Sequence, residues 1–164
     1  RFSDTRNPVV AEQVLKSCLL MPADEETLLG LRPLAAQVEA ALEDKASRTS
    51  MDPDLRQWSC FSMALLHFRE GDDERAFRWA ERSLSTLGVN PACPISTKIV
   101  LGMIEGRRGN RSMAAGYFTM AESAAGARLS RITGLGSPRS GLWLDWVNVR
   151  LLLEQANWPW ERGE

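Results

Sequence analysis

The sequence predicts an all-α fold of about seven helices, paired into three antiparallel hairpins with one closing helix and stacked as a short right-handed superhelix without a sheet. Apolar residues such as Trp58, Phe61 and Leu65 recur at the spacing of one helix face. Two segments also carry glycines in phase: Gly71 and Gly109 lie 38 residues apart, and an alanine follows each glycine five residues later. A repeated helix–glycine–helix pattern is typical of stacked helical hairpins.

The composition supports one soluble domain over residues 1–164, because 44% of the residues are apolar and 25% are charged. Twenty Lys and Arg residues balance 21 Asp and Glu residues. The chain lacks the basic excess that phosphate binding needs, so we expect no nucleic-acid partner. No apolar stretch approaches the roughly 20 residues that cross a bilayer, so we expect no membrane partner. The three cysteines include no CxxC pair, which favours a reducing, cytoplasmic location.

The first hairpin is predicted over about residues 7–44. Pro8 suits the first position of a helix, because its missing N–H would have no partner there anyway. Gly30 and Pro33 are poor residues for a helix interior, so the firm part of the second helix is predicted over residues 31–44, after a kink or a short lead-in turn.

The second and third hairpins are predicted over about residues 54–87 and 94–128. Gly71 and Gly109 would form their turns, and we expect both glycines to have positive φ. The first helix of the second hairpin has apolar residues on two faces. We therefore expect it to be buried on two sides, as stacked repeats require.

Residues 45–53 and 89–94 are interpreted as connections, and a longer loop over residues 134–141 leads to the closing helix. That helix is predicted over about residues 141–156, where it would cap the last hairpin. The tail after it either folds back or frays. Residues at helical spacing are predicted to face the last hairpin: Trp143, Trp146, Val147, Arg150, Leu151 and Glu154.

The second repeat resembles a tetratricopeptide (TPR) repeat. The residues that carry this resemblance fall at the family's spacings: Leu101, Gly102, Gly109, Ala114, Phe118 and Ala121. The first repeat resembles the family less closely, since it places His67 in the tyrosine slot, and the 38-residue offset exceeds the family's 34. The resemblance implies a TPR-like superhelix.

A longer resemblance covers nearly the whole chain. Three runs are similar to the C-terminal repeat region of planctomycete-type bacterial serine/threonine kinases and WD40-repeat proteins: AEQVLKSCLLMP, WSCFSMALLHFREGDDERAFRWAERSL and WLDWVNVRLLLEQA. This resemblance implies a helical module for protein contacts. The chain begins at Arg1 without methionine, and we expect it to be a piece of a longer protein. It contains no Gly-rich nucleotide loop, HRD or DFG, so we expect neither an enzyme nor a cofactor.

Few residues are candidates for chemistry. His67 is the single histidine and is expected to be a packed or hydrogen-bonded core residue. Cys18 and Cys60 occupy apolar helical positions, whereas Cys93 lies between two prolines and is expected to be exposed. The acids at residues 72–74 are expected to be solvated at a helix start, where the helix dipole favours them. An enzymatic hypothesis would need His67 or these acids to cluster with other ionisable groups in a pocket.

We therefore expect a protein-interaction scaffold that serves as a docking or regulatory region of a larger bacterial signalling protein. The TPR resemblance implies that the first helix of each hairpin lines the concave side. The predicted groove residues are Glu12, Lys16, Phe61, Leu65, Arg69, Met103 and Arg107. This lining is apolar with basic edges, so the expected partner is an acidic and apolar protein segment, from another protein or from the parent chain.

Two alternatives stay open. Neighbouring helices could cover Phe61 and Leu65, which would leave no apolar groove. The whole chain could also be a purely structural packing module, or a self-association module, without a separate ligand.

Overall fold

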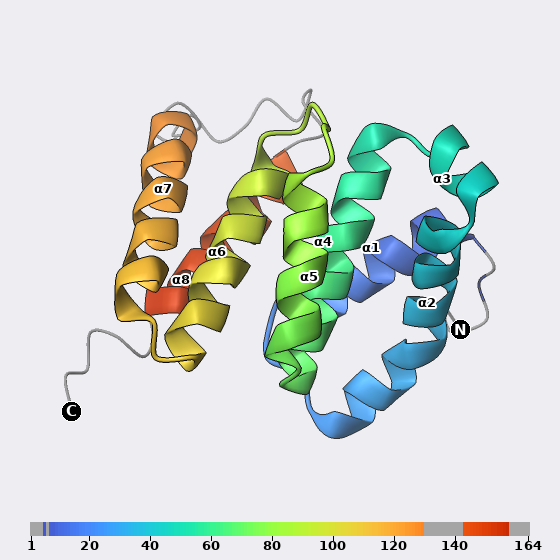
Figure 1. Ribbon diagram of the computed structural model, residues 1–164, viewed down its shortest axis with the longest axis horizontal. Coiled ribbons are helices and arrows are strands. Elements are labelled where there is room, and N and C mark those ends of the chain that lie inside the picture. Colours follow the sequence, from blue (N-terminus) through green and yellow to red (C-terminus); the bar gives the residue numbers. More distant parts are fainter. Residues whose placement is uncertain (1–4, 6, 130–142, 158–164) are drawn as a thin grey trace. The chain divides into compact units, whose positions relative to one another are not determined.

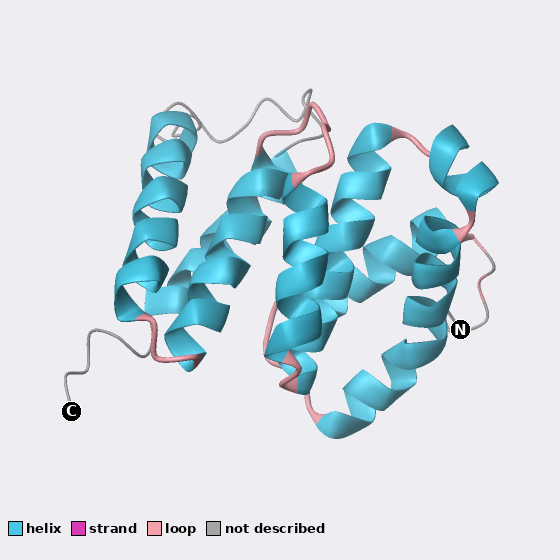
Figure 2. Ribbon diagram, in the orientation of Figure 1, coloured by secondary structure: helices cyan, strands magenta, loops and turns pink. Residues whose placement is uncertain are grey.

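The computed structural model describes residue 5 and residues 7–129 and 143–157, which form eight helices and no strand (Figures 1 and 2). The prediction of an all-α fold is confirmed. The helices are α1 (Pro8–Leu19), α2 (Glu25–Glu43), α3 (Lys45–Ser50), α4 (Pro53–Glu70), α5 (Asp73–Leu84), α6 (Ala92–Arg107), α7 (Arg111–Leu129) and α8 (Trp143–Asn157). Among the described helices, none combines the length and the apolar character of a bilayer-spanning segment. The predicted loop over 134–141 and the predicted tail lie outside the described residues.

Local chemistry explains where the helices begin and end. Pro8 is the first residue of α1, and the Asn7 side chain accepts a hydrogen bond from the Val9 N–H at 3.0 Å. Gly71 and Gly109 have φ values of 84° and 82°, so their predicted positive φ is confirmed. Four further helices begin after an aspartate whose carboxylate accepts a backbone N–H of the first turn: Asp24, Asp44, Asp52 and Asp72.

Two predictions about the N-terminal half need correction. Helix α2 runs without interruption from Glu25, with Pro33 inside it. Pro33 has no backbone N–H, so the Leu29 carbonyl lacks its helical hydrogen bond. Both residues are exposed, so water can satisfy that carbonyl. Residues 45–50 form α3 instead of a plain connection. None of the residues of α3 is buried, so the sequence has no apolar periodicity there that would predict a helix. The Asp44 carboxylate caps the helix by accepting a hydrogen bond from the Ser47 N–H at 2.7 Å.

The chain divides into two compact units, with the boundary between Val89 and Asn90. In the first unit, α4 contacts α1, α2 and α5. Every residue of α4 from Gln57 to Phe68 is consequently buried, which confirms the burial on two sides expected for this helix. In the second unit, α6 contacts α7 and α8, and eleven of its residues are buried.

Helix α8 presents a different face to its unit than predicted. Its buried residues are Trp146, Val149, Leu152 and Ala156. Among the predicted residues whose side chains the structure describes, Trp146 alone is buried; Val147 is 41% exposed, and Arg150 pairs with Glu154 at 2.9 Å on the exposed side. The side chain of Trp143 lies outside the described residues. The helix has apolar residues on two sides, so spacing alone could not decide which side faces α6.

Candidate functional site

The seven predicted groove residues divide between the two units, with five in the first unit and two in the second. Phe61 and Leu65 are completely buried in the first unit. The prediction that they line an open groove is wrong, and the alternative that neighbouring helices cover them is confirmed. The reason is that α1, α2 and α5 pack around α4 and leave it no free apolar face.

Glu12 and Lys16 form a polar cluster that connects α1 to α4. Glu12 is only 2% exposed, and its Oε1 accepts a hydrogen bond from Ser62 Oγ at 2.8 Å. Lys16 Nζ lies 3.3 Å from the same oxygen and 4.3 Å from the centre of the Trp58 ring. A buried carboxylate is costly unless it is paired, and this pairing satisfies it. The two residues hold α1 in place.

Arg69 also has a structural role. Its Nε donates to the Leu19 carbonyl at 3.0 Å, and its Nη2 donates to the Leu20 carbonyl at 3.1 Å. These carbonyls end α1, where a helix leaves acceptors without partners. In the second unit, Met103 is half-buried and Arg107 is exposed at the end of α6.

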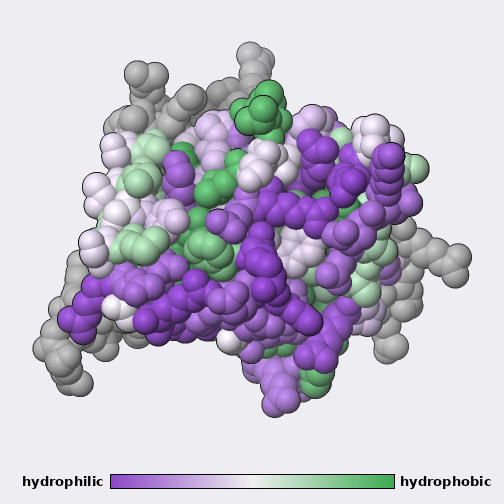
Figure 3. Space-filling model, in the orientation of Figure 1, coloured by the Kyte–Doolittle hydropathy of each residue, from purple (hydrophilic) through white to green (hydrophobic). Residues whose placement is uncertain are grey.

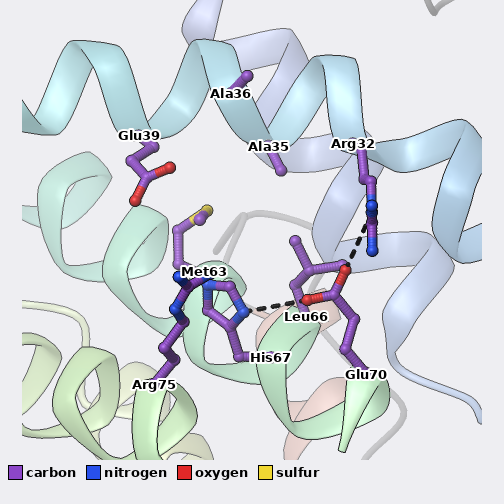
Figure 4. A pocket seen from close by; sticks show the side chains of 9 residues that line it. All are labelled: Arg32, Ala35, Ala36, Glu39, Met63, Leu66, His67, Glu70 and Arg75. Atoms are coloured by element: carbon purple, nitrogen blue, oxygen red, sulfur yellow. Dashed lines mark hydrogen bonds and ion pairs between the residues drawn. The ribbon is translucent and has the colours of Figure 1, made fainter. Parts of the chain in front are cut away.

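The first unit contains a pocket of about 250 Å³ that the sequence analysis did not anticipate (Figure 4). Residues from α2, α4 and α5 line it: Arg32, Ala35, Ala36, Glu39, Met63, Leu66, His67, Glu70 and Arg75. Ala35, Met63 and Leu66 are buried and form an apolar floor. The exposed side chains of Arg32, Glu39 and Arg75 surround that floor with charge.

Ionisable groups cluster in this pocket around Glu70. Its Oε2 lies 3.1 Å from His67 Nδ1, and its Oε1 lies 3.4 Å from Arg32 Nε (Figure 4). His67 is 7% exposed, which confirms the expectation of a packed, hydrogen-bonded histidine. Arg75 Nε lies 3.5 Å from Asp72 Oδ2. The backbone N–H of Arg75 donates to Asp72, and this hydrogen bond lowers the pKa of that carboxyl below its usual range.

The second repeat contains the same kind of pair, with the acidic residue in the first position instead of the second. Glu105 and Arg108 lie 38 residues after His67 and Glu70, and Glu105 Oε1 is 3.2 Å from Arg108 Nη1. Both pairs join residues three apart in the last turn before a glycine of positive φ. The His67–Glu70 pair therefore has a structural explanation as a feature of the repeated helix end.

The cysteines give no sign of a reactive site. Burial raises the pKa of the Cys60 thiol to about 11, so this thiol stays protonated at neutral pH. Cys18 is exposed and Cys93 is fully buried, so both of those expectations were wrong. Cys93 is buried because α6 begins at Ala92, ahead of the predicted start. Within the described parts of the chain, no three His, Cys, Asp or Glu side chains gather as metal ligands do.

The sequence did not predict the pocket because five of its nine lining residues come from α2 and α5, beside four from α4. The predicted groove used the first helix of each hairpin, whereas α2 and α5 are second helices. The available signal was the adjacent small pair Ala35 and Ala36 on α2, which leaves space beside a charged helix end on α4.

Comparison of this chain with protein-family models, with curated proteins and with solved structures finds no match.

Proposed function

We propose that this chain is a protein-interaction module whose first unit receives a side chain of a partner segment in the pocket between α2, α4 and α5. The supporting observation is the combination of a buried apolar floor with a charged, exposed rim. Protein contact sites commonly have this anatomy, with an apolar centre and a polar border. The volume of about 250 Å³ is below the usual range of small-molecule pockets, about 300–1,000 Å³, and suits one or two side chains.

The same proposal places the module in a larger bacterial signalling protein with a serine/threonine kinase-like parent. The support for this part is the resemblance of the three sequence runs described above. The partner segment then belongs to another protein or to another part of the parent. No Ser, Thr, Cys or Tyr lines the pocket, and the repeated side-chain pair at the helix end accounts for His67, so the proposed role is binding without catalysis.

Selection from a displayed random-peptide library tests the proposal. The variant Ala36→Trp places a large ring at the rim of the pocket, where the alanine is exposed and the fold can accept it. Ala115→Trp is the matched control, because Ala115 is exposed on α7 in the other unit. We expect selected peptides to bind the wild type and Ala115→Trp but not Ala36→Trp. Equal binding to all three proteins, or no enriched peptide, would contradict the proposal.

Self-association is a second candidate function, and the second unit supplies the observation that favours it. Met113 and Met120 on α7 are about half exposed, and Leu144 and Val147 on α8 are exposed as well. The surface over α7 is mostly pale to green in Figure 3, in contrast with the largely hydrophilic surface over α5. Sedimentation velocity over a concentration series tests it. Self-association predicts a dimer that Met120→Glu dissociates, and a monomer at all concentrations would contradict it.

A further inference from the structure

One face of α2 lies along the α4–α5 hairpin and carries four residues at helical spacing: Arg32, Ala36, Glu39 and Glu43. Ion pairs join both ends of this face to the hairpin. Arg32 lies 3.4 Å from Glu70 on α4, and Glu43 accepts a hydrogen bond from Arg82 on α5. Glu39 lies between these two pairs, where α2 borders the pocket. The face is therefore ion-paired to the hairpin at both ends but not at Glu39.

The charges around the pocket balance except for Glu39. Arg32 is paired with Glu70, and Arg75 lies 3.5 Å from Asp72 Oδ2, so both arginines are compensated. Glu39 forms no ion pair and no side-chain hydrogen bond with the residues that the structure describes. One negative charge consequently remains at the pocket, and a positively charged group of a partner complements it.

The apolar floor sets the second requirement on the partner. Ala35, Met63 and Leu66 are each at most 6% exposed, and an aliphatic group placed on them removes apolar surface from water on both partners. Figure 4 shows the Glu39 carboxylate beside Met63, at the end of the pocket opposite Arg32. Lysine meets both requirements with one side chain, because its methylene stem can lie on apolar surface while its ammonium stays beside a carboxylate and water.

We infer that this pocket receives a lysine side chain of a partner protein, with the methylene stem on the floor of Ala35, Met63 and Leu66 and the ammonium at Glu39. The inference rests on the proposed function and adds the chemistry of the side chain that enters. Because Glu39 is exposed, its ion pair supplies selectivity more than affinity. This partner differs from the acidic segment expected from the sequence, since the basic residues behind that expectation do not line the pocket.

The test titrates the whole chain with three capped peptides of sequence Gly-Ala-Xaa-Ala-Gly, in which Xaa is lysine, acetyl-lysine or glutamate. Acetylation keeps the stem of lysine and removes its charge. Binding is followed by NMR of ¹³C-methyl methionine, with Met63 as the reporter in the pocket and Met113 and Met120 as reporters outside it. We expect the lysine peptide to shift the Met63 signal and to bind about two- to fivefold more tightly than the acetyl-lysine peptide, as an exposed ion pair predicts. Added salt should reduce this preference.

Two exposed variants locate the effect. Glu39→Gln should make the lysine and acetyl-lysine peptides bind equally, whereas Glu81→Gln should keep the preference, because Glu81 is in the same unit and does not line the pocket. If the acetyl-lysine or the glutamate peptide binds as well as the lysine peptide, or if Glu39→Gln keeps the preference, the inference is refuted while the proposed function stands. If no peptide shifts Met63, the inference is refuted, and the peptide-library selection decides the proposed function separately.

Discussion

Single residues set the ends of the helices in this protein. Gly71 and Gly109 lie in the left-handed region, and a Cβ added at either position would meet no atom within 4 Å. Their importance is therefore conformational and does not come from close packing. Asp24, Asp44 and Asp72 act at the opposite helix ends, where each carboxylate accepts an N–H that the helix cannot satisfy.

Replacing two glycines by alanine should change stability in opposite directions. Gly71→Ala should lower the free energy of unfolding by about 1–2 kcal/mol, because a Cβ is strained at positive φ. Gly30→Ala should raise it by up to about 1 kcal/mol, since Gly30 lies inside α2 with open space around it. Urea unfolding followed by circular dichroism measures both values. Two changes of the same sign would contradict this account of the turn.

Acid should weaken the capped helix starts. The pKa values of three cap aspartates are lowered by hydrogen bonds: from Thr27 to Asp24, from Ser47 to Asp44 and from Arg75 to Asp72. The unfolded chain then binds protons more readily than the folded one, so this stability is complete above about pH 5 and is lost as the pH falls through about 4 toward the lower folded values.

The triple variant Asp24→Asn, Asp44→Asn, Asp72→Asn keeps the caps but cannot titrate at these positions. Its urea midpoint should fall less than that of the wild type between pH 7 and pH 3. An equal fall in both proteins would show that other carboxyl groups carry the acid sensitivity.

At the scale of elements, the two repeated hairpins solve the same packing problem with different residues. A Cβ added at Gly102 would lie 2.5 Å from the Phe118 ring, so the glycine makes room for the aromatic side chain. The positions 38 residues earlier hold Ala64 and Ala80, both fully buried. In the second repeat, a large side chain packs against a glycine. In the first repeat, two alanines occupy the same two positions.

A double-mutant cycle tests this exchange. Gly102→Ala alone should crowd Phe118, and the same substitution in a Phe118→Ala background should be stabilising, because the pair then matches Ala64 and Ala80. We expect a coupling energy of at least about 0.5 kcal/mol. Gly116→Ala serves as the control, since it lies in α7 with open space around it and should gain stability in either background. Additive effects at Gly102 and Phe118 would rule out the exchange.

The orientation of α8 gives a second prediction for an element. Leu152 is fully buried and Leu144 is 55% exposed on the same helix. Leu152→Ala should cost about 2–5 kcal/mol, because it removes core contacts and leaves a cavity. Leu144→Ala should change stability by no more than about 0.5 kcal/mol. Thermal and urea unfolding of the two variants would reveal a reversed order if the helix presented its other apolar side.

For the whole molecule, the division into units separates the two proposed functions. The first unit holds the candidate pocket, and the second unit carries the exposed apolar residues of α7 and α8. The proposed binding and the proposed self-association can therefore be altered by different substitutions, and Ala115→Trp serves as the control for the pocket because it lies in the other unit.

Removal of α8 should destabilise the second unit. A chain that ends at Ser140 loses the buried side chains of Trp146, Val149 and Leu152, each contributing about 1.5–3 kcal/mol of burial. Hydrogen exchange of the backbone amides should accelerate throughout α6, the main contact of α8. Full-length Leu144→Ala should exchange like the wild type. Unchanged exchange in the shortened chain would show that α8 does not protect this unit.

Sequence alone determined the features that depend on neighbouring residues in the chain. Pro8 marks a helix start, and the left-handed glycines at 71 and 109 mark helix ends, because caps and φ preferences act within a few residues. The continuous apolar character of the helix around Phe61 likewise indicated burial on more than one side.

Tertiary structure decided which face of each helix is covered by neighbouring helices. Phe61 and Leu65 belong to the core, Cys93 is buried and Cys18 is exposed, and α8 turns Leu152 inward and Val147 outward. The pocket combines residues of α2 with residues of the α4–α5 hairpin, which follows in the chain only after α3. Periodicity shows that a helix has an apolar side but does not name its neighbour; the neighbour is selected by packing over the whole unit, which no local pattern records.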